Sequence, residues 1–200
     1  MRAFHAYDIR GIWNKDFDKD DVYKIGFYLP SLLEADKVLV GRDARISSPE
    51  VFESLVKGIT DAGVDVYNIG IGTTPMVYFG TVKHGFEASV QITASHNAKE
   101  YNGLKVSCKG AMPVGYDNGL GELEKTINAS IPEPATVKGS VIDLDIKDEY
   151  IAFLSGRRQG EMINDGIYHP KITQKDYTID PDNDTMETID RKTRAAAYIA

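Results

Sequence analysis

A polar loop that follows an apolar run is the part of the sequence best equipped for chemistry. The small and β-branched residues of Ala88-Ser89-Val90-Gln91-Ile92 predict a buried strand, and Leu104-Lys105-Val106-Ser107 predicts a second one. The loop between them carries a serine, Ser95, and a titratable neighbour, His96. A hydroxyl at a strand end among cationic and amide donors suits phosphoryl transfer, in which the protein mainly positions groups and neutralises charge.

The composition is that of an ordinary globular chain. Of its 200 residues, 42% are hydrophobic and 26% are charged. The net charge of −7 leaves no basic stripe that could displace counterions, so we expect no nucleic-acid partner. A phosphate ligand stays possible, because it requires only local cations.

The sequence also bears on the compartment. No apolar run approaches the roughly 20 residues that span a bilayer, so we expect no membrane contact. The first residues turn polar too soon for the apolar core of a signal peptide. The one cysteine, Cys108, excludes an intramolecular disulfide, and a reducing cytoplasm is the simplest interpretation. The sequence does not indicate an oligomeric state.

Strand and helix patterns alternate through the first 130 residues. We expect strands at 37–40, 64–69, 88–93 and 104–107, and helices at 20–29, 48–62, 76–84 and 119–128. Beyond them, 141–144 predicts a short strand and 147–155 a further helix. This alternation implies a layered α/β domain with helices on both faces, whose ligand lies at the carboxyl ends of the strands.

Prolines predict where the helices begin and end. We expect Ser48 to cap the second helix with Pro49 at its first position, or Ser47 to form a capping box with Glu50. Thr74 before Pro75 predicts the next helix start, and Pro30 is expected to break or kink the first helix. The loop 70–75 lacks the third glycine of a dinucleotide-binding fingerprint, which excludes that interpretation.

Several ordered motifs resemble one enzyme family. Ser95-His96-Asn97 followed by Tyr101-Asn102-Gly103-Leu104-Lys105 is similar to the phosphoserine loop of the α-D-phosphohexomutases, the phosphoglucomutases and phosphomannomutases. Ala98 stands where the family has proline, which removes stiffness but no chemical group. Tyr7-Asp8-Ile9-Arg10-Gly11 and Gly41-Arg42-Asp43 match further family segments, and the resemblance extends over about residues 4–155. Arg42 and Asp43 suit either the edge of the active site or a structural ion pair.

The resemblance implies a three-layer α/β/α domain over residues 1–155 with a mostly parallel mixed sheet. A tail or an incomplete second-domain segment would follow at 156–200. The implied reaction interconverts hexose 1-phosphate and hexose 6-phosphate of glucose or mannose through a hexose 1,6-bisphosphate, and phosphorylated Ser95 donates and recovers the phosphoryl group. Mg²⁺ would bind a phosphate oxygen on Ser95.

The family pattern also assigns roles to individual residues. The catalytic set would be Ser95, His96, Arg10 and Lys105, and the groups in contact with the phosphorylated hexose would be Tyr7, Arg10, Asn97, Asn102 and Lys105. Arg10 and Lys105 would neutralise charge and assist proton transfer, while His96 would hold the loop or orient an oxygen. For Ser95-His96-Asn97 taken alone, ordinary turn chemistry at a strand end is the alternative.

Two alternatives stay open. A truncated domain that binds a phosphosugar without turnover is favoured by the short chain, in which no later-domain motif of the family is recognisable. A serine hydrolase is a distant third interpretation, because Gly-x-Ser-x-Gly is absent around Ser95.

Asp180, Asp182 and Asp184 have the spacing of a metal loop, but their neighbours favour a solvated acidic turn.

Overall fold

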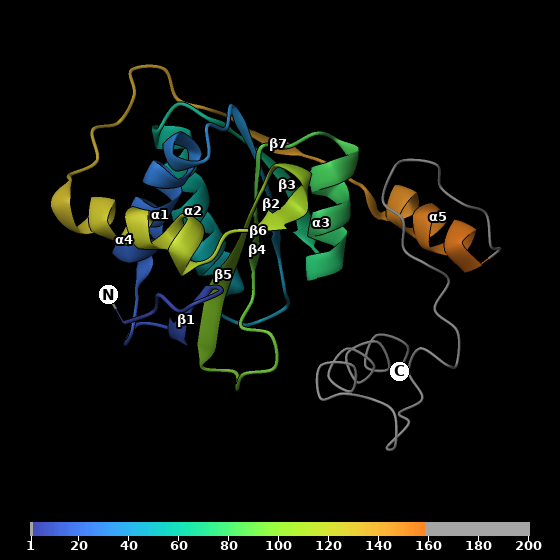
Figure 1. Ribbon diagram of the computed structural model, residues 1–200, viewed down its shortest axis with the longest axis horizontal. Coiled ribbons are helices and arrows are strands. Elements are labelled where there is room, and N and C mark those ends of the chain that lie inside the picture. The colour runs from blue at the N-terminus through green and yellow to red at the C-terminus, as the bar shows by residue number, and fades with distance from the viewer. Residues whose placement is uncertain (1, 159–200) are drawn as a thin grey trace, which may run out of the picture. The chain divides into compact units, whose positions relative to one another are not determined.

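The computed structural model describes residues 2–158, and these form one mixed sheet with helices (Figure 1). The strands are β1 (Ile9–Ile12), β2 (Lys37–Arg42), β3 (Asp65–Ile71), β4 (Ala88–Ile92), β5 (Tyr101–Cys108), β6 (Met112–Pro113) and β7 (Val141–Asp143). The helices are α1 (Lys19–Leu32), α2 (Ser48–Asp61), α3 (Thr74–Lys83), α4 (Leu120–Ala129) and α5 (Lys147–Arg158), with short 3-10 turns η1 (Lys109–Ala111) and η2 (Tyr116–Asn118).

The seven-stranded sheet has the order β1-β5-β4-β2-β3-β7, and β6 pairs with β5. The pairings of β2 with β3 and β4, and of β3 with β7, are parallel. The strand β5 pairs antiparallel with β1, β4 and β6, so β5 alone runs against the other described strands. The predicted mostly parallel mixed sheet is therefore confirmed.

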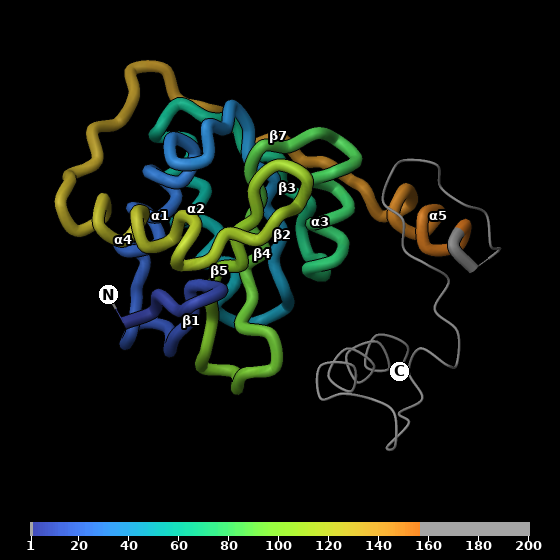
Figure 2. Tube along the Cα trace, in the orientation of Figure 1, coloured from blue at the N-terminus to red at the C-terminus, as the bar shows by residue number. Residues whose placement is uncertain are grey.

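The helices α1, α2 and α4 cover one face of this sheet and α3 covers the other, which confirms the three-layer arrangement (Figures 1 and 2). Each face packs against its own apolar core. Alternate residues of β2 divide between the cores: Val38 and Val40 face α1, α2 and α4, while Leu39 faces α3. The first core takes buried residues from the three helices together with Ile9 and Leu104. The second is smaller and includes Ile146 from the segment before α5.

Glycines bring α1 and α2 into close contact. A Cβ at Gly26 would collide with the carbonyl oxygen of Leu55, and one at Gly58 would collide with that of Tyr23. The backbones of α1 and α2 are therefore in close contact where Gly26 meets Leu55 and Gly58 meets Tyr23.

The structure corrects several predicted boundaries. The helix α1 continues through Pro30 to Leu32, and Asp18 caps its start by accepting hydrogen bonds from Asp20 and Asp21. The N-cap of α2 is Ser47, the second of its two predicted positions, whereas the N-cap of α3 is Thr73, one residue before the predicted Thr74. Ser47 makes no side-chain capping bond, so the capping box with Glu50 does not form.

The strand β5 begins at Tyr101, three residues before the predicted start. Asn102 and Gly103 pair with Gly11 and Arg10 of β1, and this long-range pairing extends the strand into the segment expected to be loop. The polar loop after β4 is consequently shorter than the sequence suggests.

Contacts within the chain divide it into the units Met1–Leu154 and Ser155–Ala200, and most of the second unit lies outside the described residues. The domain boundary that the sequence suggests at residue 155 stays a prediction. Among the helices of residues 2–158, none has the length and apolar character required to cross a bilayer.

Candidate active site

The site lies where the parallel strands end. The loops after β2, β3 and β4 meet at the carboxyl edge of the sheet, and the register of β1 with β5 brings Ile12 and Tyr101 to the same edge. Since Ile9 and Leu104 face the first core, their neighbours Arg10 and Lys105 project from the opposite face of the sheet. The topology therefore gathers the predicted loop and both predicted cations in one region.

Ser95 has a left-handed backbone conformation, with φ of +56°. Its N–H donates to Thr93 Oγ1 at 2.9 Å, and Asn97 N–H donates to the Ala94 carbonyl oxygen at 3.1 Å. The hydroxyl itself is exposed and lies 3.4 Å from His96 Nδ1. A non-glycine residue adopts this conformation at an energetic cost, so the surroundings of Ser95 must enforce it.

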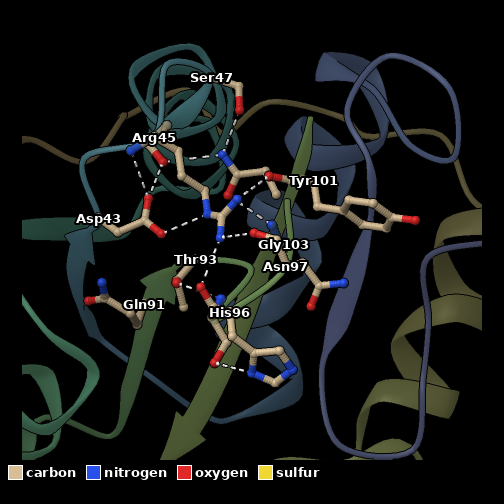
Figure 3. Close-up of polar contacts among 12 residues, drawn as sticks. Asp43, Arg45, Ser47, Gln91, Thr93, His96, Asn97, Tyr101 and Gly103 are labelled. Carbon is tan, nitrogen blue, oxygen red and sulfur yellow. Dashed lines mark hydrogen bonds and ion pairs between the residues drawn. The ribbon is translucent and has the colours of Figure 1, made fainter. Parts of the chain in front are cut away.

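Arg45 lies at the centre of the loop (Figure 3). Its Nη2 donates to the carbonyl oxygens of Ser95 and Asn97, both at 2.8 Å. Its Nη1 donates to those of Ala98 at 2.7 Å and Tyr101 at 3.1 Å. One guanidinium group thus binds four backbone carbonyls of a single loop.

Asp43 in turn positions Arg45. Its Oδ2 accepts from Arg45 Nε at 3.0 Å, and its Oδ1 accepts from the Ser48 hydroxyl at 2.7 Å and from the Arg45 backbone N–H at 3.1 Å. The Asp43 N–H donates to the Ile92 carbonyl oxygen at the end of β4. Of the two predicted interpretations for Asp43, the structure shows the ion pair, and it lies directly beside the candidate site. Arg42 packs its guanidinium over the ring of Phe52 instead.

A second charged group surrounds Asp8, whose side chain is 8% exposed. One carboxylate oxygen lies 3.2 Å from Lys105 Nζ, and the other lies 3.7 Å from Arg10 Nε. Arg10 also donates from Nη1 to Asn97 Oδ1 at 3.0 Å, which joins this group to the Ser95 loop. Arg10, Asn97 and Lys105 are therefore brought together as the sequence predicts, with Asp8 between the two cations.

The other two predicted contact residues differ from these. Asn102 is fully buried, and its amide nitrogen donates to the hydroxyls of Ser47 at 2.9 Å and Ser48 at 3.2 Å. These bonds hold β5 against the start of α2. Tyr7 is 85% exposed and free to meet a ligand. Direct contact of either residue with a sugar stays a prediction.

The described residues do not complete a metal site. Within residues 2–158, no three His, Cys, Asp or Glu side chains are grouped so that they could hold a metal ion. The run Asp180–Asp184 lies outside the described residues. In the described part of the chain, a divalent cation would find no set of carboxylates of the kind it prefers.

Sequence reasoning missed Arg45 and Asp8. Asp8 lies inside the matched segment Tyr7-Asp8-Ile9-Arg10-Gly11, and Arg45 follows the matched segment Gly41-Arg42-Asp43 by two residues. The available signal was the charge alternation in Arg42-Asp43-Ala44-Arg45, but sequence does not show which of the two arginines faces the loop.

The fold is a three-layer α/β/α domain with a serine-bearing loop at the carboxyl edge of its sheet. Residues 1–132 match the family model described as phosphoglucomutase/phosphomannomutase, alpha/beta/alpha domain I. The chain therefore belongs to the phosphoglucomutase/phosphomannomutase family.

Individual relatives agree with this assignment. A phosphomannomutase from Escherichia coli is 34% identical over 158 residues, covering 78% of this chain and 35% of the relative. A phosphoglucomutase from Neisseria meningitidis serogroup B is 36% identical over 156 residues, covering 76% of this chain and 34% of the relative. The crystal structure of a phosphoglucomutase/phosphomannomutase family protein from Burkholderia thailandensis superposes with a TM-score of 0.68 at 34% identity. The match covers 78% of this chain and 35% of that protein. The chain thus spans about a third of the length of these relatives.

Proposed function

We propose that this chain is the phosphoserine-bearing domain of a phosphohexomutase that interconverts hexose 1-phosphate and hexose 6-phosphate of glucose or mannose. The observation that carries the proposal is the Ser95 loop: Ser95 is exposed and has a left-handed backbone conformation, and Arg10 contacts the same loop through Asn97. Family membership supplies the reaction class, and relatives named for both sugars leave the hexose open.

The proposed step exchanges one phosphoryl group between oxygens. A bond forms between Ser95 Oγ and the phosphorus of a hexose 1,6-bisphosphate, and the bond from phosphorus to the sugar oxygen breaks. The serine hydroxyl loses its proton and the sugar oxygen gains one, so the products are phosphoserine and a hexose monophosphate. Transfer in the reverse direction to the other end of the sugar completes the interconversion.

The described side chains suit distinct parts of this step. His96 Nδ1, 3.4 Å from Ser95 Oγ, is placed to orient the hydroxyl or to receive its proton. Arg10 offers forked donors to phosphate oxygens, and Lys105 offers a point charge. Asp8 keeps these two cations together before a ligand arrives. Asn97, Asn102 and Tyr7 complete the proposed set of substrate-binding residues. In this set, Asn102 acts through its hydrogen bonds to the start of α2.

Mg²⁺ remains the expected cofactor through the family resemblance, with a phosphate oxygen on Ser95 as its ligand in this part of the chain. When bound, such an ion offsets charge on the transferred group. Within residues 2–158, no group of three His, Cys, Asp or Glu side chains could hold such an ion.

A second candidate is a phosphosugar-binding domain without turnover. This candidate concerns the given residues by themselves, which span 35% of the Escherichia coli relative. Both candidates predict binding of a hexose phosphate, but turnover belongs to the mutase alone. Isothermal titration with glucose 1-phosphate and a coupled mutase assay on the same preparation separate them.

The experiment that tests the proposal is intact mass after incubation with glucose 1,6-bisphosphate and Mg²⁺. One added phosphoryl group on the wild-type chain, with none on Ser95→Ala, supports the mutase-type step. Addition to both proteins would place the reactive group elsewhere, and addition to neither would leave the binding domain as the better account.

A further inference from the structure

We propose that Arg45 is the positioning residue of the Ser95 loop: its guanidinium sets the backbone conformation in which Ser95 receives the phosphoryl group, and it takes no part in binding phosphate. This inference rests on the proposed function for its kinetic consequence. Its structural content, that Arg45 fixes the loop, stands on the contacts alone.

Every N–H donor of the Arg45 side chain has an acceptor within the chain. An arginine side chain has five N–H groups, and the structure gives Arg45 five acceptors. They are Asp43 Oδ2 and the carbonyl oxygens of Ser95, Asn97, Ala98 and Tyr101, at distances of 2.7 to 3.1 Å (Figure 3). Since each donor has an acceptor, none is left for a phosphate oxygen. Arg45 therefore differs in role from Arg10, which meets the loop through a side chain.

The loop turns its backbone carbonyls toward Arg45 and Ser95 toward solvent. Four carbonyl groups turn toward Arg45, whose side chain is 13% exposed, and this leaves the hydroxyl of Ser95 on the solvent side. Ser95 needs an external constraint to keep its φ of +56°. The bond from Arg45 Nη2 to the Ser95 carbonyl, at 2.8 Å, acts directly on that residue. The loop is thus preorganised before a sugar phosphate arrives.

Arg45 is itself anchored to the rigid scaffold through Asp43. Asp43 connects it to the end of β4 through the Ile92 carbonyl and to the start of α2 through the Ser48 hydroxyl. Asn102 bonds to the same Ser48 hydroxyl. A lysine at this position keeps the charge but has three donors on one nitrogen, so it cannot reach four carbonyls and a carboxylate together.

The test uses the full chain with Arg45→Lys, and Asp43→Asn as a milder variant in case the first one folds poorly. Asp61→Asn serves as the matched control, because it weakens the fold at the far end of α2 and does not touch the loop. Three quantities are measured: amide hydrogen exchange by peptide, the single-turnover rate of phosphoryl addition at saturating glucose 1,6-bisphosphate, and the Kd of that ligand.

For Arg45→Lys we expect exchange in peptides covering 94–101 to be at least about tenfold faster, with exchange in α2 and β3 unchanged. The transfer rate should fall about 100-fold, the order of loss expected for a misplaced reacting group, while Kd changes less than about threefold. At temperatures where Asp61→Asn is folded, we expect neither faster exchange in peptides covering 94–101 nor a lower rate of phosphoryl transfer than in the wild type.

Other outcomes overturn the proposal or separate it from the proposed function. A Kd raised about 100-fold with an unchanged rate would make Arg45 a ligand-binding group, and full activity of Arg45→Lys would show that charge alone matters. If the wild-type chain accepts no phosphoryl group, the proposed function fails by itself. Hydrogen exchange alone then tests whether Arg45 fixes the loop. Unchanged protection of residues 94–101 in Arg45→Lys would overturn that role.

Discussion

The buried carboxylate of Asp61 gives the sharpest prediction about stability. Asp61 ends α2 with its side chain 3% exposed, and it accepts hydrogen bonds from Lys138 Nζ at 2.6 Å, from Lys57 Nζ and from the Tyr23 hydroxyl at 3.0 Å. The Lys138 bond and then the Lys57 bond outweigh burial and lower the pKa of Asp61 from 3.8 to about 2. This carboxylate therefore joins α1, α2 and the segment before β7.

The magnitude follows from proton linkage. Because the pKa of Asp61 is lower in the folded chain, its carboxylate stabilises the fold above the unfolded pKa of 3.8, and this contribution is lost as the pH falls from about 4 toward about 2. The difference between the two pKa values corresponds to about 2 kcal/mol of unfolding free energy at neutral pH. Both lysines are more than half exposed, so they regain water when the carboxylate is removed.

We therefore expect Asp61→Asn to lower the free energy of unfolding by about 2 kcal/mol at pH 7 and by much less at pH 2.5. Urea unfolding across this range, followed by the fluorescence of Trp13, measures both values. Asp117→Asn removes an exposed carboxylate on η2 and is the matched control, for which we expect no such difference. If the wild type and Asp61→Asn differed in unfolding free energy by the same amount at pH 7 and at pH 2.5, the linkage reasoning would be refuted.

Two further substitutions test the packing and the charges at the site. A Cβ at Gly103 would collide with the Ile9 carbonyl oxygen and lie 3.1 Å from Thr93 O, so Gly103→Ala should lower the unfolding free energy by about 1–3 kcal/mol. Gly156→Ala, where a Cβ meets no atom within 4 Å, should cost nothing in the same urea experiment, and equal losses would contradict the reasoning. Asp8→Asn removes the charge between the site cations and should slow phosphoryl transfer to Ser95 roughly tenfold in the intact-mass time course. A rate equal to that of the wild type would show that Asp8 does not position them.

The architecture was predictable because its signals are local. Apolar runs ending in polar loops located β2, β3 and β4, and the rule that ligands lie at their carboxyl edge placed Ser95 correctly in the fold. The start of β5 was missed because it depends on pairing with β1, about 90 residues away in sequence. Periodicity within a short window carries no information about such a partner.

The site was predictable at the level of motifs but not of contacts. The resemblance located Arg10, Asn97 and Lys105, which the structure does bring together. It did not assign Arg45, since an arginine saturated by backbone carbonyls looks in sequence like any surface arginine. Asn102 shows the reverse case: it lies in the matched motif, yet its amide is used inside the fold.

The most direct test of the central claim is intact mass of the full chain after incubation with glucose 1,6-bisphosphate and Mg²⁺, beside Ser95→Ala. Our account predicts one added phosphoryl group on the wild-type chain, located on Ser95 by peptide mass analysis, and none on the variant. A wild-type chain that binds the bisphosphate but gains no mass would contradict it.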